Sequence, residues 1–206
     1  MEFDKFIGID PSFKGLGFSC IDTKNKIITL DELSVDVGYG SFKEIAEAST
    51  NMVRLFNHTL YKYTNEKALI GMEIPPVSGM YAVKLWALDT HLYNNIRDKD
   101  VWLFNVPYLK FINKKYESKK DTKEMINQII DVFKENGYEI NQKLKDKKGK
   151  DKKFTSNECD SFVYCIRMFV KYHYDNGIEN PMLAEIININ ERFIEEKETK
   201  LGKKIK

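Results

Sequence analysis

The chain has 206 residues, of which 42% are hydrophobic and 13% aromatic, which is enough apolar material for a packed core and excludes a wholly disordered chain. Charged residues make up 31%, but 33 Lys and Arg nearly balance 31 Asp and Glu, so the net charge of +2 does not indicate a partner. These numbers predict a globular protein with a single domain over residues 1–206.

Targeting and redox signals are missing from the sequence. There is no apolar run that could cross a bilayer and no apolar signal segment at the start. The three cysteines form no CxxC pair and no even disulfide framework. We therefore expect a cytoplasmic protein with reduced thiols and no contact with a membrane.

The start of the chain predicts three short strands in succession. Residues 3–9 end in an apolar run that is typical of a buried strand, and residues 18–21 and 26–30 are the next two candidates. A polar turn at residues 22–25 separates the last two, and Gly15 and Gly17 loosen the first connection. We therefore expect a β-meander here, and not a strand that leads directly into a helix.

The middle of the chain alternates helices and strands. Residues 41–63 have apolar side chains at helical spacing, with Ser41 and Glu44 in the positions of a capping box. Residues 68–73 predict a buried strand that ends on an acid, and Pro75 and Pro76 stop it. A helix at about residues 80–96, a strand at 101–106 and a helix at 119–137 follow.

The last third of the chain begins with a strongly basic run. Residues 143–153 contain seven lysines and one apolar residue, which predicts a flexible, solvated loop. Thr155 or Ser156 then caps an apolar helix from residue 159 to about 174, and Pro181 opens a charged C-terminal segment at 181–206 with a last helix. The order of these elements predicts the α/β class with a mixed sheet.

Three acids interrupt otherwise apolar segments. Asp10 and Glu73 each end a predicted buried strand, and Asp160 lies near the start of the late helix. Carboxylates that come close together repel and raise each other's pKa unless a cation neutralises them. Hard oxygen ligands suit Mg²⁺, and two such ions about 3.5–4 Å apart can support phosphodiester hydrolysis. A turn or a helix dipole explains any one of these acids, but the combination predicts a metal-dependent nuclease.

The acids and their surroundings resemble the RuvC family of Holliday junction resolvases. The similar features are GIDPS followed by two glycines, an acid that ends a fourth strand, and a late helix with an acid. Leu109 and Lys110 before a loop, and the helix from Lys123 to Ile130, add a further match. The resemblance extends loosely from Lys5 to about Val170.

The resemblance implies an RNase H-like fold, with a five-stranded mixed sheet flanked by helices. It also implies Mg²⁺ as cofactor, which Mn²⁺ can replace, and a homodimer that resolves four-way junctions and other branched DNA by paired hydrolysis. Asp10, Glu73 and Asp160 would bind the metal. A compact, lysine-rich chain with an AT-rich codon bias suits a bacteriophage member of the family.

The fourth position of the site departs from the family pattern. RuvC enzymes usually have Asp or His three residues before the last acid, but this chain has Asn157 there and Glu158 beside it. Glu158 lies two residues before Asp160, and the side chains of residues two apart on a helix point about 200° apart. Glu158 therefore points away from the side of Asp160 unless the first turn of the helix is irregular. Two residues are rival candidates for the fourth member of the site. Asn157 would offer a neutral amide oxygen, and Glu158 would offer a negative charge that can bind the metal.

Lysines and aromatic residues gather before and within the predicted third helix. By resemblance, Lys110 and Lys123 approach the scissile phosphate, where a cation stabilises developing negative charge. A solvated helix face explains any single lysine, whereas the cluster favours DNA contact, and the loop at 143–153 would add a salt-sensitive contact. The further residues predicted to contact DNA are Lys114, Lys115, Lys119, Lys120 and Tyr81.

Other functions fit parts of this sequence pattern. A phosphotransferase of the actin–sugar kinase type also opens with a strand that ends in Gly-Ile-Asp, but it needs two such domains, and the chain has no second copy. We therefore expect no nucleotide cofactor. An RNase H-like ribonuclease and a protein that binds branched DNA without cutting it remain as alternatives.

Overall fold

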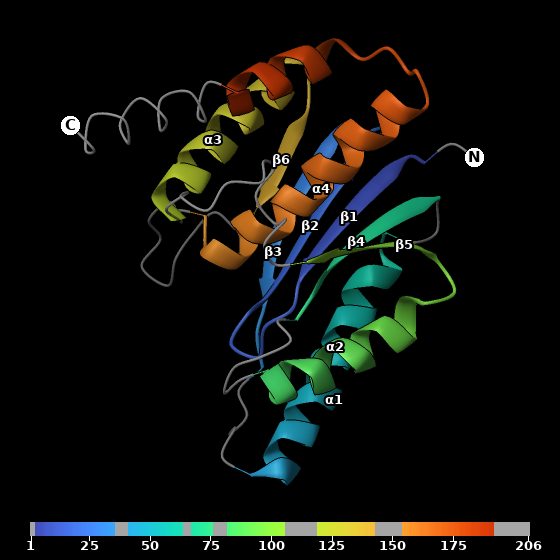
Figure 1. The fold of residues 1–206 in the computed structure, drawn as a ribbon, viewed down its shortest axis with the longest axis vertical. Coiled ribbons are helices and arrows are strands. Elements are labelled where there is room, and N and C mark those ends of the chain that lie inside the picture. Colours follow the sequence, from blue (N-terminus) through green and yellow to red (C-terminus); the bar gives the residue numbers. More distant parts are fainter. Residues whose placement is uncertain are drawn as a thin grey trace, which may run out of the picture.

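The computed structural model describes residues 3–35, 41–63, 67–75, 82–105, 119–142 and 154–191. This part of the chain forms a six-stranded sheet with helices on both faces (Figure 1). The strands are β1 (Lys5–Asp10), β2 (Leu16–Asp22), β3 (Ile27–Leu33), β4 (Ala68–Ile74), β5 (Asp100–Asn105) and β6 (Glu139–Gln142). The helices are α1 (Phe42–Tyr61), α2 (Ala82–Ile96), α3 (Lys119–Glu135) and α4 (Ser156–Asp175), and residues 181–191 are also helical.

The sheet has the strand order β5-β4-β1-β2-β3-β6. β1, β2 and β3 form the expected meander, in which Ile7 pairs with Cys20 and Ser19 pairs with Leu30 in antiparallel register. β4 runs parallel to β1, and β5 runs parallel to β4. The mixed sheet and its helices confirm the predicted α/β class.

The number of strands was predicted wrongly, because the sheet has a sixth strand beyond β3. β6 lies parallel to β3, with Ile28 beside Ile140. It has only four residues and a single apolar side chain, so it leaves no alternating pattern in the sequence. Its pairing with β3, a strand more than one hundred residues earlier in the chain, stabilises β6. This pairing begins where the Glu139 amide donates to the Lys26 carbonyl oxygen.

The helix ends follow the capping signals in the sequence. The Glu44 amide donates to Ser41 Oγ and the Ser41 amide donates to the Glu44 carboxylate, as the predicted capping box requires. α3 ends before Gly137, whose φ of +84° is the left-handed conformation that favours glycine after a helix. Thr155 is the N-cap of α4, so this helix starts at Ser156, three residues earlier than predicted.

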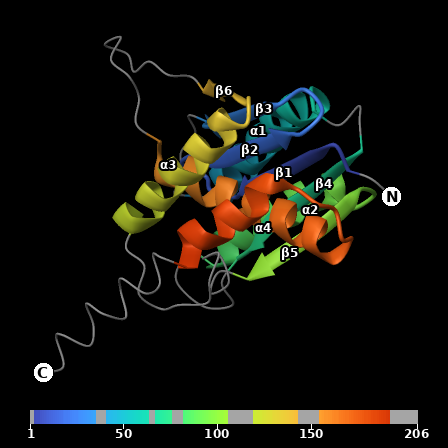
Figure 2. The same cartoon turned by 90° about the horizontal axis from the view of Figure 1, so that it is seen from above.

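Two apolar layers cover the two faces of the sheet. Because side chains alternate along a strand, Phe6 of β1 faces α3 and α4, while Ile7 and Ile9 face α1 and α2. Figure 2 shows α3 and α4 in front of the strands and α1 and α2 behind them. The segment at 181–206 was predicted to be charged and to contain a last helix; residues 181–191 are helical and pack into the core through Met182, Ile186 and Ile189.

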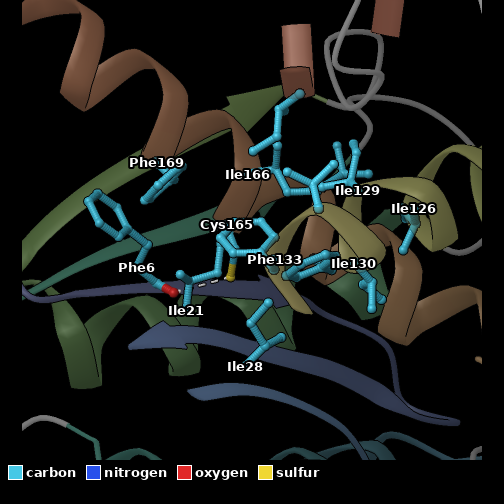
Figure 3. Close-up of a cluster of buried hydrophobic side chains, with 14 of the residues drawn as sticks. Phe6, Ile21, Ile28, Ile126, Ile129, Ile130, Phe133, Cys165, Ile166 and Phe169 are labelled. Carbon is cyan, nitrogen blue, oxygen red and sulfur yellow. Dashed lines mark hydrogen bonds between the residues drawn. The ribbon is translucent and has the colours of Figure 1, made fainter. Parts of the chain in front are cut away.

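α4 lies directly against β1 and β2. A Cβ at Gly8 would meet the Ser161 carbonyl oxygen, and one at Gly17 would meet the Asn157 carbonyl oxygen. Within this contact, Ser161 Oγ lies 2.6 Å from the Ser19 hydroxyl. One turn later, Cys165 Sγ donates to the Phe6 carbonyl oxygen (Figure 3). Since Gly17 pairs with Asp10, this packing places the start of α4 at the C-terminal end of β1.

None of the helices in the described ranges combines the length and the apolar character that crossing a membrane would require. Cys20, Cys159 and Cys165 are buried thiols without disulfide bonds.

Candidate active site

Asp10 and Glu73 end two neighbouring parallel strands. Ile9 of β1 pairs with Met72 of β4, so the two acids follow side by side and point to the face that α4 covers. Asp10 is buried and Glu73 is half-buried. Their side chains are close enough to share a hydrogen bond. The structure therefore brings together the two acids that the strand pattern singled out.

The surroundings of this acid pair make it unfavourable for both carboxyl groups to be ionised. Burial raises the pKa of Asp10 well above its ordinary value, and the charge of Glu73 raises it further. Burial also raises the pKa of Glu73, although hydrogen bonds from Asp10 and Tyr164 counter part of the shift. Two buried carboxyl groups in contact are stable only when they share a proton or bind a cation.

Asp160 is the third predicted acid at this site. It is half-buried and lies five residues after the Thr155 N-cap, in the second turn of α4 and not the first. Its negative charge raises the pKa of both Asp10 and Glu73, so it lies within electrostatic range of the pair. The three acids thus converge from β1, β4 and α4.

Asn157 and Glu158 form hydrogen bonds that stabilise the start of α4. The Glu158 carboxylate accepts from the Thr155 amide at 2.7 Å and from Gln142 Nε2 at 3.4 Å, and its side chain is buried. Asn157 Nδ2 donates to the Gly15 carbonyl oxygen at 2.5 Å. These contacts give both side chains a structural role at the N-cap, and a direct role toward a metal stays a prediction for either one.

Tyr164 is a residue of the site that sequence reasoning missed. Its hydroxyl donates to Glu73 Oε2 at 2.7 Å, and its fully buried ring stacks on Phe104 with centroids 5.2 Å apart. Burial, with the charges of Glu73 and Asp10, raises the pKa of Tyr164 well above its ordinary value, so the hydroxyl keeps its proton as a donor. The available signal was its position four residues after Asp160, on the same side of α4.

Asp89 of α2 is a second residue that the sequence did not single out. Its side chain is buried, and burial and the charge of Glu73 raise its pKa to about 8. It also acts on the pKa of Asp10. The sequence predicted a helix at about residues 80–96, but nothing in its local pattern linked Asp89 to Asp10 or Glu73.

The acids fit a hydrated cation better than a closed cage of ligands. Within the described ranges, no three His, Cys, Asp or Glu side chains are gathered tightly enough to enclose a metal ion by themselves. The Asp10–Glu73 pair is in contact, whereas Asp160 and Asp89 act on it through their charge. Mg²⁺ keeps several waters and takes only one or two carboxylates directly, so a contacting pair with outer acids suits it.

Of the lysines predicted at the site, the side chain of Lys123 is described. It is half-buried in α3, whose N-terminal end lies at the same end of the sheet as the start of α4 (Figure 1). Burial raises the pKa of Cys159 to about 12, and the nearby Lys123 ammonium opposes that shift, so Lys123 lies close to the neighbour of Asp160. The predicted residues outside the described ranges are Tyr81, Lys110, Lys114, Lys115 and the run at 143–153; Lys119 and Lys120 open α3, but their side chains are not described.

No model of a protein family matches the chain, and no curated protein matches it. Solved structures that are similar to it include RuvC of Thermus thermophilus, with a TM-score of 0.49, and T. thermophilus RuvC in complex with a Holliday junction substrate, with a TM-score of 0.48. Both alignments have 12% identity and cover 84% of this chain and 97% of the other. This likeness concerns the course of the backbone only, and the role of each residue rests on the geometry above.

Proposed function

We propose that the protein is a divalent-cation-dependent endonuclease that cuts branched DNA, as RuvC-type resolvases do. The observation that carries this proposal is the contact between the buried Asp10 and the half-buried Glu73 on adjacent parallel strands, with Asp160 nearby on α4. Such a group of charges is unfavourable without a cation. When bound, Mg²⁺ or Mn²⁺ activates a water and stabilises the leaving oxygen in phosphodiester hydrolysis.

The residues around the acids have separate tasks in this proposal. Asp10 and Glu73 hold the cation, and Asp160 adds negative charge from the opposite side of the site. Tyr164 fixes one oxygen of Glu73 through its hydrogen bond, which leaves the other oxygen for the cation. Lys123 stabilises negative charge on the phosphate, because its ammonium lies at the edge of the acid group.

The distribution of basic residues supports a nucleic acid as the substrate. Three lysines fall within the first five residues of α3, which begins at the end of the sheet where the acids lie. Seven more lie between Gln142 and Phe154, and Gln142 is hydrogen bonded to Glu158 at the N-cap of α4. A basic helix start beside an acidic centre, and a lysine-rich run next to it in the sequence, suit a phosphate backbone as the substrate. The motif resemblance to RuvC favours branched DNA within this class.

A comparison of substrates tests the proposal. We expect the purified chain to nick a labelled four-way junction in Mg²⁺, to leave a linear duplex of the same sequence intact, and to do neither in EDTA. Faster hydrolysis of an RNA–DNA hybrid than of the junction would identify a ribonuclease H instead. A shift of the junction on a native gel in EDTA, without cutting in Mg²⁺ or Mn²⁺, would identify a binding protein.

Tyr164→Phe removes the hydrogen bond to Glu73 and keeps the buried ring. We expect cleavage to fall about 10-fold to 100-fold and the Mg²⁺ concentration for half-maximal rate to rise, because residues that orient metal ligands have effects of that size. Tyr174→Phe is the matched control, since Tyr174 lies on the same helix and is 78% exposed. Equal rates and equal Mg²⁺ dependence for both variants would remove Tyr164 from the site.

We propose that the chain acts as a homodimer through α2. Trp86 and Tyr93 lie two turns apart on this helix, and 43% and 38% of their surfaces are exposed. Paired cuts in a two-fold symmetric junction call for two active sites related by the same symmetry. Trp86→Glu should shift the chain from dimer to monomer in sedimentation velocity, whereas Phe42→Glu on α1, where Phe42 is 86% exposed, should leave the dimer intact. A monomeric wild type would contradict this part of the proposal.

A further inference from the structure

Asp89 is a buried acid, and one of its two carboxylate oxygens has no hydrogen-bond partner among the described residues. Only 4% of its surface is exposed, and Oδ1 accepts no hydrogen bond from any described residue. Its neighbours on the helix, Leu88 and Leu92, pack into the core between α2 and the sheet. A carboxylate left unpaired in such a place lowers stability, because burial removes its water and nothing replaces it.

Asp89 approaches the acid pair from the side of the sheet opposite to α4. It lies within electrostatic range of both Glu73 and Asp10, since it raises the pKa of Asp10 and Glu73 raises its own. α2 follows β4 in the chain, and its N-terminal end lies at the end of the sheet where β1 and β4 finish (Figure 1). Acids from β1, β4, α2 and α4 therefore influence one another at this end of the sheet.

We propose that Asp89 is a fourth acid of the cation site, which acts from α2 where position 157 has an asparagine. This inference rests on the proposed function. A Mg²⁺ ion held by Asp10 and Glu73 keeps several waters, and these waters need acceptors around them. The partnerless oxygen of Asp89 is such an acceptor, and a bound cation would compensate its buried charge.

Asn157 and Glu158 are weaker candidates for the fourth member of the cation site. Glu158 is turned toward the Thr155 amide and Gln142, and Asn157 is tied to Gly15 through its amide nitrogen. The charges of Asp89 and Asp160 act on the pKa of Asp10, and the charge of Glu73 acts on the pKa of Asp89. The acid that the family pattern places on the late helix is thus replaced by one on the helix across the sheet.

Titration of the full-length chain with Mn²⁺ by calorimetry tests this inference. We expect Asp89→Asn to bind Mn²⁺ about 10-fold to 100-fold more weakly than wild type, the usual effect of removing a group that supports metal ligands. Asp98→Asn makes the same chemical change at an exposed acid just after α2 and should bind like wild type. The cation-free Asp89→Asn protein should be at least as stable as wild type in urea, because an unpaired buried acid has gone.

The outcomes separate the inference from the proposed function. Wild-type Mn²⁺ affinity in Asp89→Asn, together with a loss of binding in Asp10→Asn, would overturn the role of Asp89 and leave the nuclease proposal standing. A wild-type chain that binds no Mn²⁺ would overturn both. If Asp89→Asn does not fold, Asp89→Ser provides a smaller neutral side chain with the same expected loss. Asp89→Glu should recover part of the affinity, because it restores the carboxylate.

Discussion

Asp10→Asn should abolish cleavage of branched DNA and at the same time make the cation-free protein more stable. We expect the rate to fall by about 10³-fold or more, since loss of one group from a unit that acts together removes most of the catalysis. The stability gain has a different cause. Asn has the size of Asp but no carboxylate, so the variant avoids the cost of a buried negative charge next to Glu73.

The pH dependence of stability gives the same prediction a second readout. The pKa of each acid is raised in the folded state, so its contribution to stability is complete below the pKa of the unfolded chain and is lost as the pH rises through the folded value. In EDTA, the free energy of unfolding of wild type should therefore fall from about pH 4, near the pKa of a free Asp, to about pH 8, the pKa of Asp89. Asp10→Asn should flatten this decline in urea titrations.

The same experiments can contradict the assignment of Asp10. Cleavage by Asp10→Asn at the wild-type rate would exclude it from catalysis. A variant that loses activity but is less stable than wild type in EDTA would show that Asp10 has a structural role instead. Asp98→Asn is the control for both readouts, because Asp98 is an exposed acid that follows α2.

Gly8→Ala should have the largest effect on folding. The new Cβ would collide with the Ser161 carbonyl oxygen and lie 3.0 Å from Cys165 Sγ, and a helix backbone cannot move aside as a side chain can. Overpacking of a core usually costs about 1–3 kcal/mol and occasionally more, so we expect a loss of at least about 3 kcal/mol. Urea unfolding followed by circular dichroism measures this change directly.

Gly15→Ala is the matched control for that prediction. The three atoms nearest to its Cβ would all belong to the side chain of Glu32, which can turn away, so the free energy of unfolding should change little. Similar unfolding curves for the two variants would show that α4 does not need close contact with β1. The comparison also bears on the site, because the same packing of α4 positions Asp160 and Tyr164.

The main acids could be predicted from the sequence because local patterns mark them. Asp10 and Glu73 each follow a short apolar run, and adjacent parallel strands bring such ends together. The capping box of α1 was equally visible, since Ser41 and Glu44 act within one turn. These features depend on neighbours in the chain, which the sequence displays.

The rest depended on contacts between distant segments. β6 exists through its pairing with β3, and Tyr164 and Asp89 matter because other elements bring them to Glu73. The helix start shows how a small shift changes an interpretation. Because α4 begins at Ser156, Glu158 occupies the position that closes a capping box, and its charge is used there. Sequence spacing alone left it as a rival fourth member of the site.

A cleavage assay tests most directly whether the Asp10–Glu73 pair cuts branched DNA with a divalent cation. A symmetric, end-labelled four-way junction is incubated with wild type or with Glu73→Gln, in Mg²⁺ or in EDTA. We predict that wild type in Mg²⁺ makes nicks at matching positions in two opposite strands, and that neither Glu73→Gln nor the EDTA reaction makes any. A junction that stays intact with wild type in both Mg²⁺ and Mn²⁺, or one that Glu73→Gln cuts at the wild-type rate, would contradict the proposal.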